Sequence, residues 1–308
     1  MALREEESGV NLQSSALPSV KEGGTSKEDS TAMEEGRRWE DMQVDCLVNI
    51  FRRLGLDDLT VSVPFVCTFW WRTSLDPTCW RVLNLRSLDF KTWSQFSRSF
   101  ASRYRLRTLS FSAFLRLVVH RSHGSASELI FPLSSGASVH DLAYVSINCP
   151  RLRTLALPDK LMLEDDLRIP EFIGRWKDLE QLELETKPTS FLETVAAIGH
   201  NCTRFARLKV RGLIGKEDAS AIAMCLPELK QLELSGSYLT KDELAVIVSG
   251  CRKLERLTAK DCLGFQADEE LLRLASGIHS FEHEGSRLLG DNGYETDESE
   301  QQSGFFYW

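Results

Sequence analysis

The chain lacks the features that mark secreted, membrane-spanning and zinc-binding proteins. Its N-terminus has no apolar run after the first charged residues, so we expect no secretory signal. No stretch approaches the roughly 20 apolar residues that cross a bilayer. The eight cysteines include no C-x-x-C pair, and without an export signal we expect reduced thiols in the cytoplasm or nucleus. These absences exclude disulfide scaffolds and tetrahedral zinc modules, and we expect no metal and no cofactor.

The chain also lacks a basic surplus. Residues 1–36 hold eight acids against three bases, and residues 285–308 hold five acids against one base. Residues 37–284 then carry a net charge of only +1, which gives no electrostatic reason to expect nucleic acid or an anionic membrane as a partner. The composition of both ends is typical of disorder. The sequence therefore predicts disordered acidic segments at 1–36 and 285–308.

Catalytic signatures are missing as well. The chain has no Walker loop, no dinucleotide fingerprint and no Gly-x-Ser-x-Gly elbow. The run Glu164-Asp165-Asp166 could form a paired-carboxylate site, but acids gather more often at a solvated helix start. We predict no catalytic residues and a protein that is not an enzyme.

What the chain does contain is a repeat. The pattern apolar-x-x-Leu-x-apolar recurs at intervals of 20 to 27 residues, a spacing typical of solenoids. The closing Leu-x-Leu alternates with the period of a strand. The middle residues of the successive copies are Leu83, Leu109, Leu129, Leu155, Leu182, Leu208, Leu232, Leu257 and Phe281. The sequence therefore predicts about nine strands.

Helical patterns lie between these strands, as at Leu192, Val195 and Ala196. Each strand-plus-helix unit has an apolar face that only a stacked neighbour can bury. We therefore predict an α/β fold, a leucine-rich-repeat solenoid over residues 80–284 with parallel strands inside and helices outside. The interval of 20 residues leaves little room for a helix in 112–128, so we expect an irregular repeat there with an exposed loop near 120–127.

Cysteine and histidine also fall on the repeat. Cys149, Cys202 and Cys251 each precede the first apolar position of a repeat by three residues, as small buried hydrophobes would. His279 to His283 spells H-x-x-E-H, a zinc-protease signature that requires a helix. The repeat places this segment on a strand, where residues four apart lie about 13 Å from each other. That separation is too large for two ligands of one zinc ion.

A different pattern precedes the repeats. Leu47, Ile50, Phe51 and Leu54 share one face of a helix, Gly55 follows as a stop signal, and a second helical pattern runs from Leu59 to Cys67. Four of the seven tryptophans fall in or beside this stretch, at 39, 70, 71 and 80. Three short helices cannot bury so much apolar surface by themselves. Some of it is expected to face a partner.

The residues of this front segment resemble an F-box. The run Asp41 to Phe51 is similar to the first helix of that module, and Val66-Cys67-Thr-Phe-Trp70 and Asp76-Pro77-Thr-Cys-Trp80 are similar to its later landmarks. Together with the repeats, residues 39–284 resemble the plant F-box/leucine-rich-repeat proteins, with a three-helix F-box module at 37–82.

The resemblance implies a non-catalytic subunit of an SCF-type ubiquitin ligase. Its F-box would dock on a Skp-type adaptor, which joins a cullin-RING ligase, and its repeats would bind a protein substrate. By motif position, the residues implied to contact the adaptor or to pack the module are Met42, Leu47, Ile50, Phe51, Leu54, Leu59, Val66, Cys67, Trp70 and Trp80.

Two positions depart from the family's pattern. Met42-Gln43 replaces the family's Leu-Pro at the head of the first helix, which removes a preset φ at a helix start. Pro64 lies inside the second helical pattern, where it should kink or split the helix. These departures keep an alternative open: a non-catalytic repeat scaffold whose F-box-like module does not assemble a ligase.

The outward positions of the predicted strands suggest a substrate surface. One strand carries Glu183 and Glu185 and the next carries Arg207, Lys209 and Arg211. These charges could pair with one another across the sheet. Alternatively, the basic strand could receive an acidic or phosphorylated segment of the substrate, because arginine suits bidentate anion contacts. The expected substrate-binding residues are Arg207, Lys209, Arg211, Glu183, Glu185, Arg256 and Lys260.

Overall fold

The computed structural model describes residues 42–133, 137–159 and 166–288. The chain divides into two compact units, one ending at Phe205 and the other beginning at Ala206. The first contains strands β1 to β4 and the second contains β5 to β8. No helix within these ranges is long and apolar enough to cross a membrane. The predicted segment 1–36 lies outside the described residues.

The first unit opens with short helical pieces. They are α1 (Val44–Phe51), a π-helical turn (Asp58–Ser62), a 3-10 turn (Val63–Phe65), α2 (Thr68–Thr73) and a 3-10 turn (Pro77–Trp80). The predicted second helix is thus split, because Pro64 cannot donate a backbone hydrogen bond to continue a helix. The thiol of Cys67 starts α2 by accepting a hydrogen bond from the Trp70 N–H.

Two aromatic residues hold these pieces together. Trp80 is fully buried, and its indole Nε1 donates a hydrogen bond to the Ser74 carbonyl at 2.7 Å. The Phe51 ring, 1 % exposed, meets the Trp70 ring edge-to-face with centroids 5.3 Å apart. Leu47, which lies in the same helix as Phe51, α1, is also buried. Two of the four apolar residues predicted to share a helix face, Leu47 and Phe51, therefore pack inward.

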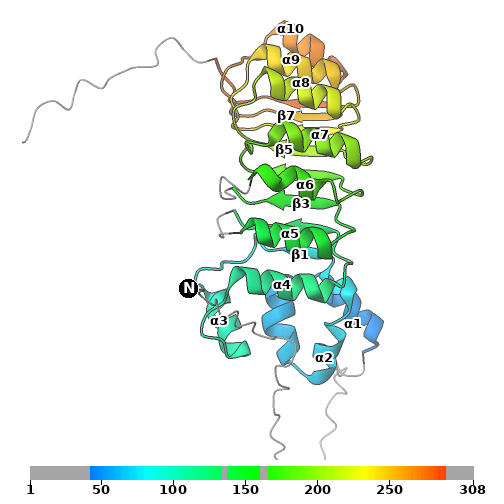
Figure 1. Cartoon of the computed structure of the whole chain (residues 1–308), viewed down its shortest axis with the longest axis vertical. Helices are drawn as coiled ribbons and strands as arrows, with labels where there is room; N and C mark the ends of the chain where they lie inside the picture. The colour runs from blue at the N-terminus through cyan, green and yellow to red at the C-terminus, as the bar shows by residue number, and fades with distance from the viewer. Residues whose placement is uncertain (1–41, 134–136, 160–165, 289–308) are drawn as a thin grey trace, which may run out of the picture. The chain divides into compact units, whose positions relative to one another are not determined.

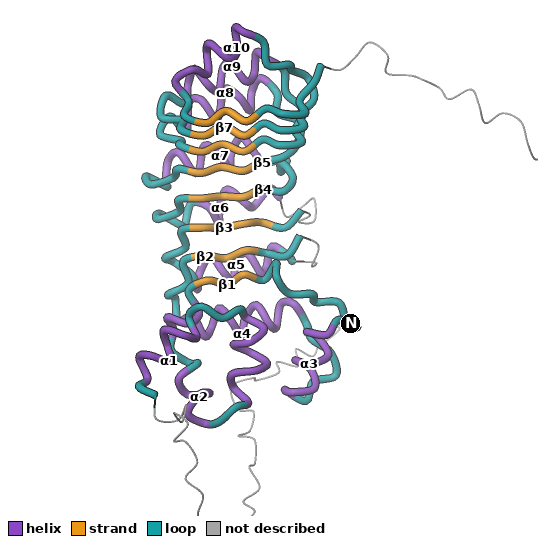
Figure 2. The backbone as a smooth tube through the Cα atoms, turned by 180° about the vertical axis from the view of Figure 1, so that it is seen from behind, coloured by secondary structure: helices purple, strands orange, loops and turns teal. Residues whose placement is uncertain are grey.

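The strands of the first unit are parallel and follow chain order (Figure 2). They are β1 (Val82–Asn84), β2 (Glu128–Ile130), β3 (Thr154–Leu157) and β4 (Gln181–Leu184). Their middle leucines are in register and 0 % exposed: Leu83, Leu129, Leu155 and Leu182. The repeated leucine is therefore the core of the sheet.

Helices line one side of these strands (Figure 1). They are α4 (Phe111–Ser122), α5 (Val139–Asn148), a 3-10 turn (Asp166–Arg168), α6 (Ile169–Ile173) and α7 (Phe191–Asn201). Helix α3 (Gln95–Tyr104) lies instead beside the front helical pieces. Within the described residues, the predicted α/β arrangement of parallel strands and return helices is confirmed.

One predicted repeat is wrong. The copy centred on Leu109 forms no strand, because β1 pairs directly with β2. Phe111 instead begins α4, whose buried residues Phe114, Leu115, Val118 and Val119 have helical spacing. Without a strand at 109 there is room for both α3 and α4 between β1 and β2. The segment expected to be an irregular repeat with an exposed loop is therefore mostly a helix with a buried face, and the described strands number eight rather than nine.

The second unit repeats the same plan. Its strands are β5 (Arg207–Val210), β6 (Gln231–Glu233), β7 (Arg256–Thr258) and β8 (Ser280–Glu282). Its helices are α8 (Lys216–Cys225), α9 (Lys241–Gly250), α10 (Glu269–Leu274) and a 3-10 turn (Ala275–Gly277). Beyond the strands, a ladder of single parallel bridges joins Leu213, Tyr238, Leu263 and Arg287. Residues 285–288, which the sequence places in the acidic tail, therefore complete the last repeat.

The repeat cysteines are buried, as predicted. The Cys202 thiol donates to the Trp176 carbonyl at 3.3 Å, and the Cys262 thiol donates to the Leu234 carbonyl at 3.2 Å. Burial raises the pKa of Cys149 to about 12 and that of Cys251 to about 11. The thiols therefore remain protonated and serve as small apolar side chains, and those of Cys202, Cys251 and Cys262 also donate to a carbonyl of the preceding repeat.

Candidate protein-binding surfaces

The ten residues predicted to serve adaptor binding separate by burial. Four of them are at most 1 % exposed and belong to the core: Leu47, Phe51, Leu59 and Trp80. Two are exposed, Ile50 at 39 % and Val66 at 58 %. The other four are half-buried: Met42, Leu54, Cys67 and Trp70. Of the ten residues, Ile50 and Val66 are therefore the most accessible to a partner.

The sequence-based prediction missed one exposed apolar residue. Val44, the first residue of α1, is 50 % exposed. It lies one turn before Leu47, and the apolar stripe was counted only from Leu47 onward. Helical spacing extended one turn back from Leu47 would have found it. Val44, Ile50 and Val66, here called the front apolar residues, lie on or beside helical pieces that are anchored in the core.

Contacts with α3 and α4 fix the front segment to the rest of the first unit. The Tyr104 hydroxyl donates to the Thr60 carbonyl at 2.8 Å, and the Tyr104 ring meets the Phe65 ring edge-to-face at 5.6 Å. The guanidinium of Arg121, on α4, lies 5.5 Å from the centre of the Trp80 ring. Burial lowers the pKa of Arg121. The front segment thus packs firmly on α3 and α4, the helices that continue into the repeats.

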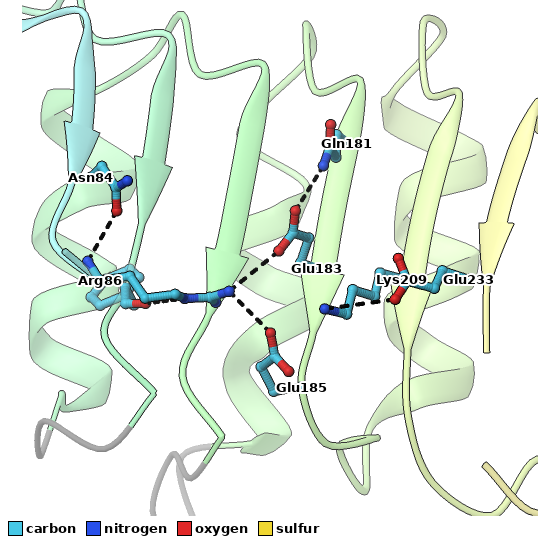
Figure 3. Close-up of polar contacts among 8 residues, drawn as sticks. Asn84, Arg86, Gln181, Glu183, Glu185, Lys209 and Glu233 are labelled. Atoms are coloured by element: carbon cyan, nitrogen blue, oxygen red, sulfur yellow. Dashed lines mark hydrogen bonds and ion pairs between the residues drawn. The ribbon is translucent and has the colours of Figure 1, made fainter. Parts of the chain in front are cut away.

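On the sheet face of the first unit, the two predicted acids are held by an arginine (Figure 3). The Arg86 Nη1 atom lies 3.1 Å from an oxygen of Glu185 and 3.6 Å from an oxygen of Glu183. The Arg86 Nε also donates to the Phe131 carbonyl at 3.2 Å, and Gln181 donates to Glu183 at 2.8 Å. These three charged side chains are 19 to 26 % exposed.

This cluster was not foreseen, because Arg86 follows β1, whereas Glu183 belongs to β4 and Glu185 directly follows β4. The two are about a hundred residues apart in sequence, and only the parallel stacking of β1 to β4 brings them together. Glu183 and Glu185 therefore serve the first unit's own charge cluster. They are weaker candidates for substrate contact than the sequence suggested.

In the second unit, both predicted lysines are paired with acids. Lys209 lies 3.8 Å from Glu233, and Lys260 lies 2.6 Å from Glu282 and 3.8 Å from Glu284. Lys260, and to a smaller extent Arg256, lowers the pKa of Glu282. The lysines of this face are therefore engaged within the sheet.

The arginines of this face differ. Arg207, Arg211 and Arg256 are exposed, and within the described part of the chain none of them forms an ion pair. Arg207 and Arg256 each pair in register with Gln231, so they flank it on alternate strands. Arg211 rests on Gly236, whose φ is +69° and where a Cβ would come 3.0 Å from the arginine Nε. Arg207 and Arg256 form an accessible cationic pair, here called the arginine face.

The middle of the H-x-x-E-H segment forms β8, as predicted from the repeat, and His279 and His283 flank that strand. Across the described ranges, no group of three or more His, Cys, Asp or Glu side chains is arranged to hold a metal ion. Glu164 and Asp165 of the acidic run lie outside these ranges, and Asp166 begins a 3-10 turn.

Comparison with known proteins agrees with this architecture. A family model described as FBD-associated F-box protein At5g56370, LRR repeats, matches residues 175–279. The F-box/LRR-repeat protein At3g48880 of Arabidopsis thaliana is 30 % identical over 223 residues, which cover 72 % of this chain and 71 % of that protein. The F-box protein SKIP1 of the same plant is 26 % identical over 251 residues, 75 % of this chain and 81 % of that protein.

Among solved structures, an internalin of Listeria monocytogenes aligns with a TM-score of 0.35 and 16 % identity, covering 58 % of this chain and 52 % of that one. The family assignment depends instead on the extent and identity of the plant matches. With parallel repeat strands and a helical front segment, and with a relative of 30 % identity matched over more than two thirds of both chains, the chain belongs to the plant F-box/leucine-rich-repeat family.

Proposed function

We propose that this protein is the substrate-recognition subunit of an SCF-type ubiquitin ligase in the cytoplasm or nucleus. Its front segment, residues 42–80, would be the family's F-box and dock on a Skp-type adaptor that joins a cullin-RING ligase. Its repeats would bind the target protein. The observation that carries this proposal is the set of front apolar residues, which are exposed on or beside helical pieces that are anchored by buried neighbours such as Leu47 and Phe51.

The front apolar residues have the properties of interface anchors. They are exposed while Leu47 and Phe51 of the same helix are at most 1 % exposed, so the helix is held from behind and orients Val44 and Ile50 outward. Apolar side chains on a rigid support gain the most from burial against a partner, because little ordering is required on binding. A central anchor of this kind contributes about 2 kcal/mol or more.

For the target, the arginine face is the best-supported surface in the second unit. Arginine binds carboxylate and phosphate through paired N–H donors. Arg207 and Arg256 flank the Gln231 amide, which offers a further donor between them. An acidic or phosphorylated target segment would complement this group. The chain would act by raising the effective concentration of the target near the ligase, so it needs no catalytic residue of its own.

The test is the affinity of the full-length chain for a Skp-type adaptor. Ile50→Asp should weaken binding by about 100-fold, which corresponds to the loss of roughly 2.7 kcal/mol at an anchor. Val246→Asp on α9 is a matched control, because Val246 is also 39 % exposed, and it should bind normally. Leu47 is unsuitable for this test, because truncating a buried leucine costs about 2–5 kcal/mol of stability.

The scaffold alternative is favoured by one observation, the split of the second helical segment at Pro64. If the folded wild-type chain fails to bind the adaptor, or if Ile50→Asp binds as well as Val246→Asp, the ligase proposal is wrong and the scaffold is the better account.

A further inference from the structure

The last repeat of the second unit leaves its core open. In the three preceding strands the middle apolar residue is almost fully buried: Leu208 is 2 % exposed, Leu232 1 % and Leu257 0 %. The equivalent residue of β8, Phe281, is only half-buried. The register of β7 with β8 aligns Phe281 with Leu257, so its exposure reflects a missing neighbour and not a shifted strand.

The rest of the last repeat shows the same incompleteness. Ile278 and His283, which flank Phe281 at the two other core positions, are also half-buried, whereas Leu254 and Ala259 at the equivalent positions one repeat earlier are buried. The final helix α10 exposes Leu272 at 44 % and Leu274 at 42 %. Among the described strands, β8 pairs with β7 alone.

An open repeat end of this kind is unfavourable. Each repeat buries its apolar face against the next, so the last one requires a cap. An unpaired strand edge with apolar side chains also invites pairing with other chains. Half-buried Phe281 on an edge strand therefore calls for a cover that is apolar and can satisfy backbone groups.

We propose that residues 305–308, Phe-Phe-Tyr-Trp, cover this open end of the second unit. The segment follows the exposed repeat in the sequence: 17 positions separate Leu288 from Phe305. Such a tether spans up to about 56 Å when extended, which is several times the roughly 10 Å between packed layers of a fold. Its length is therefore ample for the tetrad to return to β8 and α10.

Two further properties favour this segment over a second copy of the chain. A segment of the same chain has an effective concentration on the order of millimolar, which a free copy does not reach in dilute solution. The tetrad also fits the chemistry of the end. Its rings can pack edge-to-face on Phe281, and the tyrosine hydroxyl and tryptophan N–H can bond to groups at the strand edge. The proposal is independent of ligase function.

Photo-crosslinking of the full chain tests where the tetrad lies. Tyr307 is replaced by p-benzoylphenylalanine in an equimolar mixture of nitrogen-14 and nitrogen-15 chains. The expected result is crosslinking to peptides within 269–288 in which both partners carry the same isotope. Mixed-isotope products would show that a second copy occupies the end, and crosslinks confined to other parts of the chain would show that the tetrad binds elsewhere. Either result overturns the proposal.

Hydrogen exchange provides the energetic test. Replacing Phe305, Phe306, Tyr307 and Trp308 by Ser in the full chain should speed amide exchange in 278–284 by tenfold or more and leave α8 and β6 unchanged. The matched control, Gln301→Ser with Gln302→Ser, alters the tail outside the tetrad and should exchange like the wild type. Equal exchange in the tetrad variant and the wild type would overturn the proposal.

Discussion

Single residues of the front segment have distinct roles that depend on burial. Leu47 and Ile50 are three positions apart on α1, yet Leu47 is 0 % and Ile50 39 % exposed. The apolar pattern of the sequence placed both on one stripe and could not separate them, because the two lie only about 60° apart around a helix of 3.6 residues per turn. A combined Leu47/Ile50 variant would mix the loss of fold with the loss of contact. Ile50 alone reports on docking.

Cysteine reactivity offers a test at the same scale. The thiolate is the reactive form, and burial raises the pKa of Cys149 to about 12 and of Cys251 to about 11. At pH 8.5 in the native chain, iodoacetamide should therefore modify the exposed Cys46 at least about 100-fold faster than Cys149. Peptide mass spectrometry measures both rates, and in denaturant the difference should vanish. Comparable native rates would show that Cys149 is not buried.

The raised pKa values of Cys149 and Cys251 also make the stability of the fold depend on pH. Because the folded-state pKa values are raised, the folded chain holds these thiol protons more tightly than the unfolded chain does. The associated stabilisation is complete below the ordinary thiol pKa of about 8.5 and is lost as the pH rises toward 12.

At the scale of elements, the sequence predicts the strands well and the segment between β1 and β2 poorly. Within each unit, the repeated leucines lie in strands with their neighbours in register, from Leu129 to Leu182 in the first unit and from Leu208 to Leu257 in the second. The copy at Leu109 has the same pattern, and Leu109 is 8 % exposed, but it precedes a helix. A buried leucine beside a buried phenylalanine suits either element, so a short apolar motif cannot decide between strand and helix start.

The arginine face was predicted only in part for a related reason. Alternation along a strand shows which side chains face outward, and it correctly placed Arg207 and Arg256 on the surface. Which charges neutralise one another depends on side-chain reach across several strands. Arg86 pairs with Glu183 and Glu185 at the end of β4. No local pattern in the sequence indicates that pairing.

The Arg86 cluster should stabilise the sheet of the first unit. Arg86 and Glu183 are 26 % and 21 % exposed, so solvent screens them less than a surface pair. A double-mutant cycle with Arg86→Met and Glu183→Gln should give a coupling of about 1 kcal/mol in urea unfolding. The same cycle on Arg153 and Glu180, where the arginine is 52 % exposed, should give less. Equal couplings would mean that Arg86 does not organise this face.

At the scale of the whole molecule, the proposed function requires that the adaptor and the target bind separate surfaces. The front apolar residues belong to the first unit and the arginine face belongs to the second. Substitutions at one surface should therefore leave the function of the other intact, since substitutions at sites that share no contacts behave additively. That independence is the property required of a subunit that brings a target to a ligase.

Quantitative affinity capture from plant cells, with the proteasome inhibited, tests this independence most directly. Ile50→Asp should lose the Skp-type adaptor and cullin while it retains the other captured proteins. Arg207→Glu with Arg256→Glu should retain the adaptor and cullin and lose at least one protein that the wild type and Ile50→Asp both capture. If the wild type captures no adaptor, or if both variants keep or lose the same partners, the assignment of adaptor and target to separate surfaces is contradicted.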